Sequence, residues 1–197
     1  MSLTVTKNGT TNYAWSVPAN TGRNQKTFTG RTKSVNSPST YVDTTFRQPG
    51  KAEFVQLVSS SAISVSKNGT TKTITVLSNS SRLNVELLRN SVNASVGGII
   101  INNVSYVNNS QITGDPGADE EYEAVITVNF NANTIASAKG VDVKITDNAG
   151  HSVICSLTQE AQTASITVSQ QTVSVPASGG SGSINVTAND TWTVEAV

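Results

Sequence analysis

Almost the same nine residues occur twice in this chain, 60 positions apart. The first copy, Leu3–Thr11, reads LTVTKNGTT, and the second, Ile63–Thr71, reads ISVSKNGTT. Each copy alternates apolar and polar residues, the pattern of a strand with one buried face, and then reaches an Asn-Gly turn. A third opening, Ile166–Ser169, continues through a Gly-Gly turn into Ile184–Val186. Recurring strand openings of this kind predict similar β-units joined in series.

The second and third segments also match beyond their openings. With one residue of slippage, the matched pairs are Asn79 and Asn189, Leu83 and Trp192, and Val85 and Val194. Similar pairs of strands are therefore expected in both segments.

The ends of the first two segments resemble each other as well. Val42–Gln56 and Val141–Gln159 each read as a strand, a Gly-containing turn and a second strand, which predicts a closing hairpin. The spacing from Gln56 to the next opening at Ile63 is seven residues, and the spacing from Gln159 to Ile166 is the same. Short linkers of equal length are typical of an array with fixed spacing.

We therefore expect three units. Residues 1–61 form a reduced, basic N-terminal immunoglobulin-like unit, and residues 62–164 form a complete immunoglobulin-like sandwich of about 100 residues. Residues 165–197 supply the first half of a third unit. Half a sandwich leaves one core face uncovered and sheet edges unpaired. That unit is thus expected to be completed by another chain, to be disordered, or to continue in a longer parent protein, and we favour the last.

The composition supports strands throughout. Val and Ile total 36 residues against 7 Leu, and β-branched side chains pack well on a pleated sheet but lose rotamer freedom in a helix. The predicted fold class is all-β, with tandem immunoglobulin-like β-sandwich domains. Cys155 is the only cysteine, so no intramolecular disulfide can form, and its alternating surroundings predict a packed rather than a reactive thiol.

The sequence offers little material for catalysis. His151 is the only histidine, so neither a His-centred triad nor a multi-histidine metal site can be assembled. One group of carboxylates could bind calcium, but its spacing is irregular and a solvated acidic loop is the simpler interpretation: Asp115, Asp119, Glu120, Glu121 and Glu123. We expect a protein that is not an enzyme, with no metal and no cofactor.

Charge and hydropathy also limit the kinds of partner that we expect. The chain has zero net charge and 13% charged residues, which does not favour specific nucleic-acid binding. No apolar run approaches 18 residues, so no membrane span is expected. No leader peptide is visible after Met1, so we expect either that a leader has been removed or that the protein does not use Sec export.

The charge is unevenly distributed along the chain. Residues 1–60 hold seven Lys or Arg against two acidic residues, while residues 61–197 are net negative. Chance in a small unit would explain this excess. The alternative is that the first unit docks on an acidic surface through a basic segment. The residues of this candidate docking patch are Arg23, Lys26, Arg31 and Lys33.

Both tryptophans alternate with apolar neighbours. Trp192 is in phase with Val194, which favours a core position over a sugar-stacking one. Trp15 alternates with Tyr13 and Val17. It belongs to the core if that face points inward, and it is available for stacking if the first unit lacks a second sheet.

Two segments carry a family resemblance. Ser174–Gly180, which contains the Gly-Gly turn, and Ser183–Val194, with its alternating strand and Trp-x-Val, resemble the first half of a BACON domain, the Bacteroidetes-associated immunoglobulin-like module. Lys139–Gln159, a Gly-bearing hairpin that ends in a strand with Gln, resembles the second half. The resemblance implies a binding or spacer module without catalytic residues. Such modules occur beside carbohydrate-active enzymes, in surface proteins and in virion proteins of crAss-like phages, and carbohydrate or mucin binding has been proposed for them.

Two functions follow as expectations. The first is a virion structural protein of a bacteriophage, decorating the capsid or anchoring a fibre, with capsid or other virion proteins as partners and adhesion to glycans as an added role. The alternative is a secreted or cell-surface carbohydrate- or mucin-binding module of a gut bacterium. Either function is compatible with a homo-oligomer.

Overall fold

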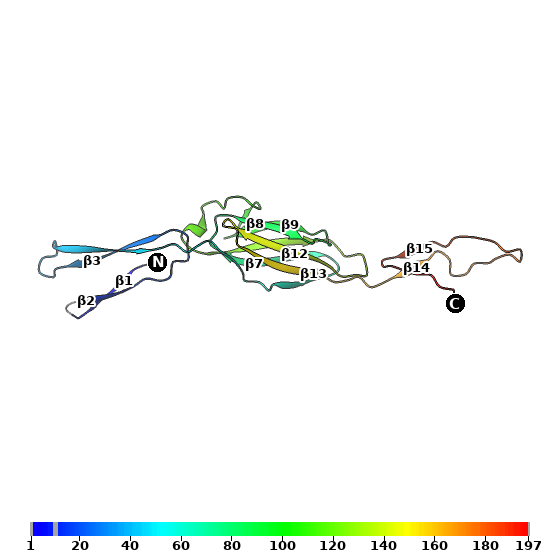
Figure 1. Ribbon diagram of the computed structural model, residues 1–197, viewed down its shortest axis with the longest axis horizontal. Helices are drawn as coiled ribbons and strands as arrows, with labels where there is room; N and C mark the ends of the chain where they lie inside the picture. The colour runs from blue at the N-terminus through cyan, green and yellow to red at the C-terminus, as the bar shows by residue number, and fades with distance from the viewer. Residues whose placement is uncertain (1, 10–11, 197) are drawn as a thin grey trace.

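The computed structural model describes residues 2–9 and 12–196, and it is an extended all-β molecule (Figure 1). A central β-sandwich lies between two N-terminal hairpins, which lie side by side at one end of the long axis, and one C-terminal hairpin at the other end. No helix in the described ranges is long and apolar enough to cross a membrane.

Two sheets make the sandwich. The first has the order β10-β9-β11-β7-β5, and its strands are Val104–Tyr106, Ser95–Ile101, Tyr122–Phe130, Thr70–Ser78 and Val55–Leu57. The second has the order β6-β13-β12-β8, with strands Ala62–Val65, Ser152–Gln159, Lys139–Asp147 and Leu83–Leu88. All pairings are antiparallel except that of β6 with β13, which is parallel. The short 3-10 helix η1, Pro116–Ala118, lies in the loop before β11.

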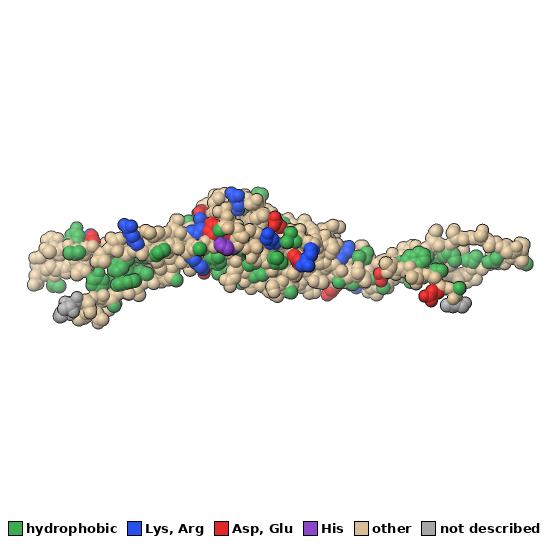
Figure 2. All heavy atoms as spheres, viewed as in Figure 1, with side chains coloured by type: hydrophobic (Ala, Val, Ile, Leu, Met, Phe, Trp, Pro, Cys, Tyr) green, Lys and Arg blue, Asp and Glu red, His purple; other side chains and the backbone are tan. Residues whose placement is uncertain are grey.

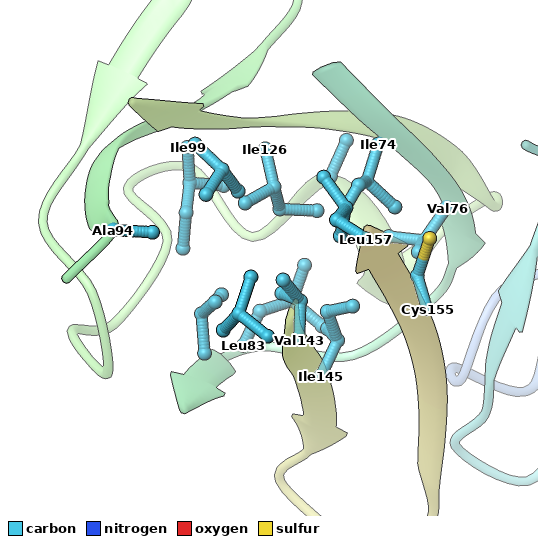
Figure 3. Close-up of a cluster of buried hydrophobic side chains, with 14 of the residues drawn as sticks. Ile74, Val76, Leu83, Ala94, Ile99, Ile126, Val143, Ile145, Cys155 and Leu157 are labelled. Atoms are coloured by element: carbon cyan, nitrogen blue, oxygen red, sulfur yellow. The ribbon is translucent and has the colours of Figure 1, made fainter. Parts of the chain in front are cut away.

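The core lies between the two sheets. Along β11 every second side chain from Tyr122 to Phe130 is buried, as expected for a strand with one inward face. Ile74 and Ile126 of one sheet point toward Val143 and Ile145 of the other (Figure 3). Burying a side chain of this size contributes roughly 1.5–3 kcal/mol, so the sandwich is the stable centre of the molecule.

Cys155 confirms the prediction of a packed thiol. Its side chain is fully buried in this core (Figure 3) and donates to the carbonyl of Ser60 at 3.3 Å. Burial raises the pKa of the Cys155 thiol above its ordinary value, which disfavours the reactive thiolate.

The ends of the molecule consist of hairpins. In the N-terminal part, β1 (Thr4–Asn8) pairs with β2 (Asn12–Ser16), and β3 (Lys26–Lys33) pairs with β4 (Tyr41–Gln48). In the C-terminal part, β14 (Ile166–Val168) pairs with β15 (Val186–Ala188). Each of these sheets has two strands within the described residues.

One of the two predicted closing hairpins forms. β12 and β13 pair from Lys139↔Gln159 to Thr146↔Ser152, which confirms the second. The first is wrong, because β4 pairs along its whole length with β3, while β5 joins the sandwich beside β7. β5 therefore lies in a different sheet from β4, and the two strands do not form a hairpin.

The expectation of similar strand pairs in the second and third segments is also wrong. In the sandwich the opening strand β6 lies in one sheet beside β13, and the following β7 lies in the other. In the third segment the matched strands β14 and β15 pair with each other. A strand that has no neighbour like β13 satisfies its backbone groups with the nearest strand available.

Candidate functional site

The first two residues of the predicted basic patch, Arg23 and Lys26, lie where the N-terminal part meets the sandwich. Arg23 Nε donates to the carbonyl of Asn79 at 2.7 Å, and its guanidinium forms ion pairs with Glu53 and Asp115. Lys26 Nζ donates to the carbonyl of Asp119 at 2.7 Å. These two basic residues therefore contact an acidic surface of the chain itself, the loop that carries Asp115 and Asp119.

The same loop carries the carboxylates considered for calcium. Asp115 is held by Arg23, and Glu121 lies 3.4 Å from Lys51 Nζ. In the part of the chain that the structure describes, no group of three or more His, Cys, Asp or Glu side chains could hold a metal ion. The loop acts in this structure as a docking surface for basic side chains.

Backbone contacts close this junction. Arg23 N donates to the carbonyl of Gly117 at 3.0 Å, and Asn24 N donates to that of Ala118 at 2.7 Å. A Cβ atom on Gly22 would lie 2.2 Å from the backbone of Asp119, closer than any side chain permits. Glycine is therefore required at position 22 for the two parts to approach.

Asn79 connects the junction to the core. It is fully buried, and its Nδ2 donates to the carbonyls of Ala52 at 3.1 Å and Thr21 at 3.3 Å. Its Oδ1 accepts from Phe54 N at 3.0 Å. Beside it, burial raises the pKa of Tyr122 to about 12, and the Tyr122 hydroxyl donates to a backbone carbonyl at 2.7 Å.

The second junction repeats this arrangement. Asn189, which the sequence aligns with Asn79, donates from Nδ2 to the carbonyl of Thr163 at 2.9 Å and accepts from Ser165 N at Oδ1 at 2.8 Å. Its backbone carbonyl accepts from Ala136 N of the sandwich at 2.9 Å. Asn79 therefore bonds to the segment that precedes the sandwich, and Asn189 bonds to the segment that precedes the C-terminal hairpin.

A groove lies between the two N-terminal hairpins. The hairpins touch through Trp15 and Phe46, whose ring centroids are 5.1 Å apart, and Tyr13 donates to Thr44 Oγ1 at 3.1 Å. The groove combines apolar and basic side chains, among them Val5, Lys7, Tyr13, Arg31, Lys33 and Val35. Such a lining suits a partner that is apolar and acidic.

The cations of the groove differ in how they are held. Arg31 donates to both carboxylate oxygens of Asp43 at 2.7 and 2.8 Å and lies over the ring of Tyr41 at 4.0 Å. These hydrogen bonds lower the pKa of Asp43 and raise that of Arg31. Lys7 and Lys33 form no ion pair with any residue in the described ranges.

The structure thus separates the four predicted patch residues into two pairs. Arg23 and Lys26 lie at the junction, whereas Arg31 and Lys33 line the groove. Lys7 belongs with the second pair, and the sequence reasoning missed it because it lies on a different hairpin. Its place on the same strand face as Val5 and Leu3, two and four residues earlier, was the available signal.

Both tryptophans are half-exposed. Trp15 has 56% of its surface accessible, which corresponds to the expectation for a unit without a covering second sheet. The core prediction for Trp192 is wrong: it is 50% exposed, lies outside the strands and lines a shallow pocket with Ile166 and Asp190. The alternating pattern was present, but the described residues contain no second sheet over Trp192.

The fold and these surfaces define an elongated β-sandwich protein with a groove at one end. In comparisons with known proteins, the chain matches no protein-family model and no curated protein.

Proposed function

We propose that this chain is a non-catalytic structural protein of a bacteriophage particle, built from tandem immunoglobulin-like units that decorate the capsid or anchor a fibre. One observation carries the proposal. Asn79 and Asn189 both form hydrogen bonds where neighbouring parts of the molecule meet, which supports a fixed spacing of these parts along an extended molecule. A protein that holds other components apart needs this property, and a catalyst does not.

The ends of the molecule support an attachment role. Charged side chains gather over the middle, while apolar side chains lie along both ends (Figure 2). Exposed apolar surface at a tip is typical of a contact with another protein. The resemblance to BACON modules adds the virion as the setting.

Labelling of phage particles tests this function. Gold-labelled antibodies against the central sandwich should decorate intact particles of the phage that encodes the chain, at a constant distance from the capsid or fibre base. Proteolysis of the terminal hairpins should release the sandwich from the particle. Label found only on bacterial cell surfaces would overturn the proposal.

A second function has an observation of its own. Trp15 and Trp192 each present a half-exposed ring, and Asp190 lies beside Trp192 in its shallow pocket. An exposed aromatic ring with a neighbouring carboxylate is a common arrangement for stacking against a sugar and accepting its hydroxyl hydrogens.

Glycan binding is therefore the alternative, in a secreted or cell-surface module. On a glycan array, Trp192→Ala should abolish any signal of the intact chain, and Trp15→Ala should weaken it if both rings bind. Val104→Ala, a change at an exposed residue of the sandwich, is the control. Unchanged binding in both tryptophan variants would rule out these rings as sugar platforms.

A further inference from the structure

The matched opening strands differ in one respect. Val5, Val65 and Val168 occupy the same position in the three openings. Val65 is fully buried in the sandwich, but Val5 is 46% exposed and Val168 is 42% exposed. The matched valine is thus packed in a core in the sandwich, whereas in the N-terminal and C-terminal hairpins about half of its side chain is uncovered.

The C-terminal end presents an apolar surface with acidic neighbours. Ile166 and Val168 share one face of β14, because side chains two positions apart point the same way. Trp192 lies in the pocket beside Ile166. Residues 165–197 contain Asp190 and Glu195 and no Lys or Arg, so this end is net negative.

The N-terminal groove is apolar and basic, and it therefore complements the apolar and acidic C-terminal end. Its apolar residues include Val5 at 46% and Val35 at 90% exposure. Lys7 and Lys33 bring positive charge without an ion-pair partner among the described residues. An apolar, acidic hairpin therefore fits this apolar, basic groove.

We propose that the N-terminal groove of one copy receives the C-terminal hairpin of a second copy. The proposal does not depend on the virion setting. Because the two contacting surfaces are different, the contact is heterologous, and each added copy still presents one free surface of each kind. The result is a head-to-tail series rather than a closed dimer.

Two variants each remove one surface. Lys7→Glu with Lys33→Glu makes the groove acidic, and Val168→Asp with Trp192→Asp places carboxylates on the hairpin face. All four side chains lie at the surface or in the open groove, so the sandwich core is untouched. The matched control is Lys72→Glu with Lys139→Glu, the same charge change on the sandwich.

Sedimentation velocity of the intact chain over a concentration series is the measurement. The wild-type chain and the control should form a ladder of species that grows with concentration and shortens at raised salt. Each interface variant alone should remain a monomer. An equimolar mixture of the two should stop at a dimer, because the pair holds one intact groove and one intact hairpin face that can meet.

Three results would overturn the proposal. They are a wild-type chain that stays monomeric throughout, a closed dimer that persists in either interface variant, and a mixture that remains monomeric while both variants show the wild-type circular dichroism. A chain that stays monomeric would mean that the two surfaces bind another partner or another segment. A closed dimer would mean an isologous contact, in which both copies use the same surface.

Discussion

One asparagine side chain lies at each junction of this molecule. Asn79 donates to carbonyls of the preceding segment and accepts from Phe54 N, and it does so with no exposed surface. A buried carbonyl or amide that loses its partner costs free energy, because water cannot replace the bond. The alignment of Asn79 with Asn189 was visible in the sequence, but their role was not, since their partners are backbone groups that carry no sequence signature.

Replacing this side chain should destabilise the protein. Asn79→Ala leaves Phe54 N and the carbonyl of Ala52 without the side chain that bonds them, so we expect the free energy of unfolding to fall by about 1–3 kcal/mol. Urea unfolding followed by circular dichroism measures it. Asn36→Ala, at an exposed position, is the control and should change little. Equal urea midpoints of unfolding for Asn79→Ala and Asn36→Ala would contradict the role given to Asn79.

The alternation of apolar and polar residues predicted the positions of the strands better than it predicted which strands pair. The segments 42–48 and 141–147 have the same pattern, and both are strands, β4 and β12. β12 turns back onto β13, whereas β4 pairs with the earlier β3. Sequence periodicity reports which face of a strand is buried, but the choice of neighbour depends on all the strands that compete for the same edge.

The candidate site shows the same limit. The basic segment was expected to dock on an acidic surface, and in the structure one of its residues, Arg23, forms an ion pair with Asp115 of the same chain. The groove was not predicted, because Lys7 and Lys33 come from separate hairpins whose contact, through Trp15 and Phe46 and through Tyr13 and Thr44, has no sequence signature. The distribution of charge along the chain could not reveal this contact.

For the whole molecule, the series of strand openings indicated an elongated arrangement, and the structure explains what fixes it. Segments of the N-terminal part and the sandwich approach to backbone contact at Gly22. We expect such a contact to restrict the motion of the two parts relative to each other. The extended shape is then a property of the folded state rather than of a flexible linker.

Small-angle X-ray scattering can test this rigidity. Gly22→Ala adds a Cβ atom that would overlap the backbone of Asp119, so the junction should open and the Kratky plot should rise at high angle, while urea unfolding of the sandwich stays nearly unchanged. Gly182→Ala, where nothing lies within 4 Å of the added atom, should scatter as the wild type does. Identical curves for both variants would show that the glycine contact does not hold the arm.

The parallel pairing of β6 with β13 determines how the molecule bears tension. A pull along the chain enters this sheet at Ala62 and leaves it at Gln159, so two neighbouring strands are drawn in opposite directions along their axes. Their hydrogen bonds then carry the load together, in shear. A hairpin pulled from its two ends, such as β14 with β15, instead unzips one bond at a time. Under tension, this molecule would therefore yield first at its terminal hairpins and last at its centre.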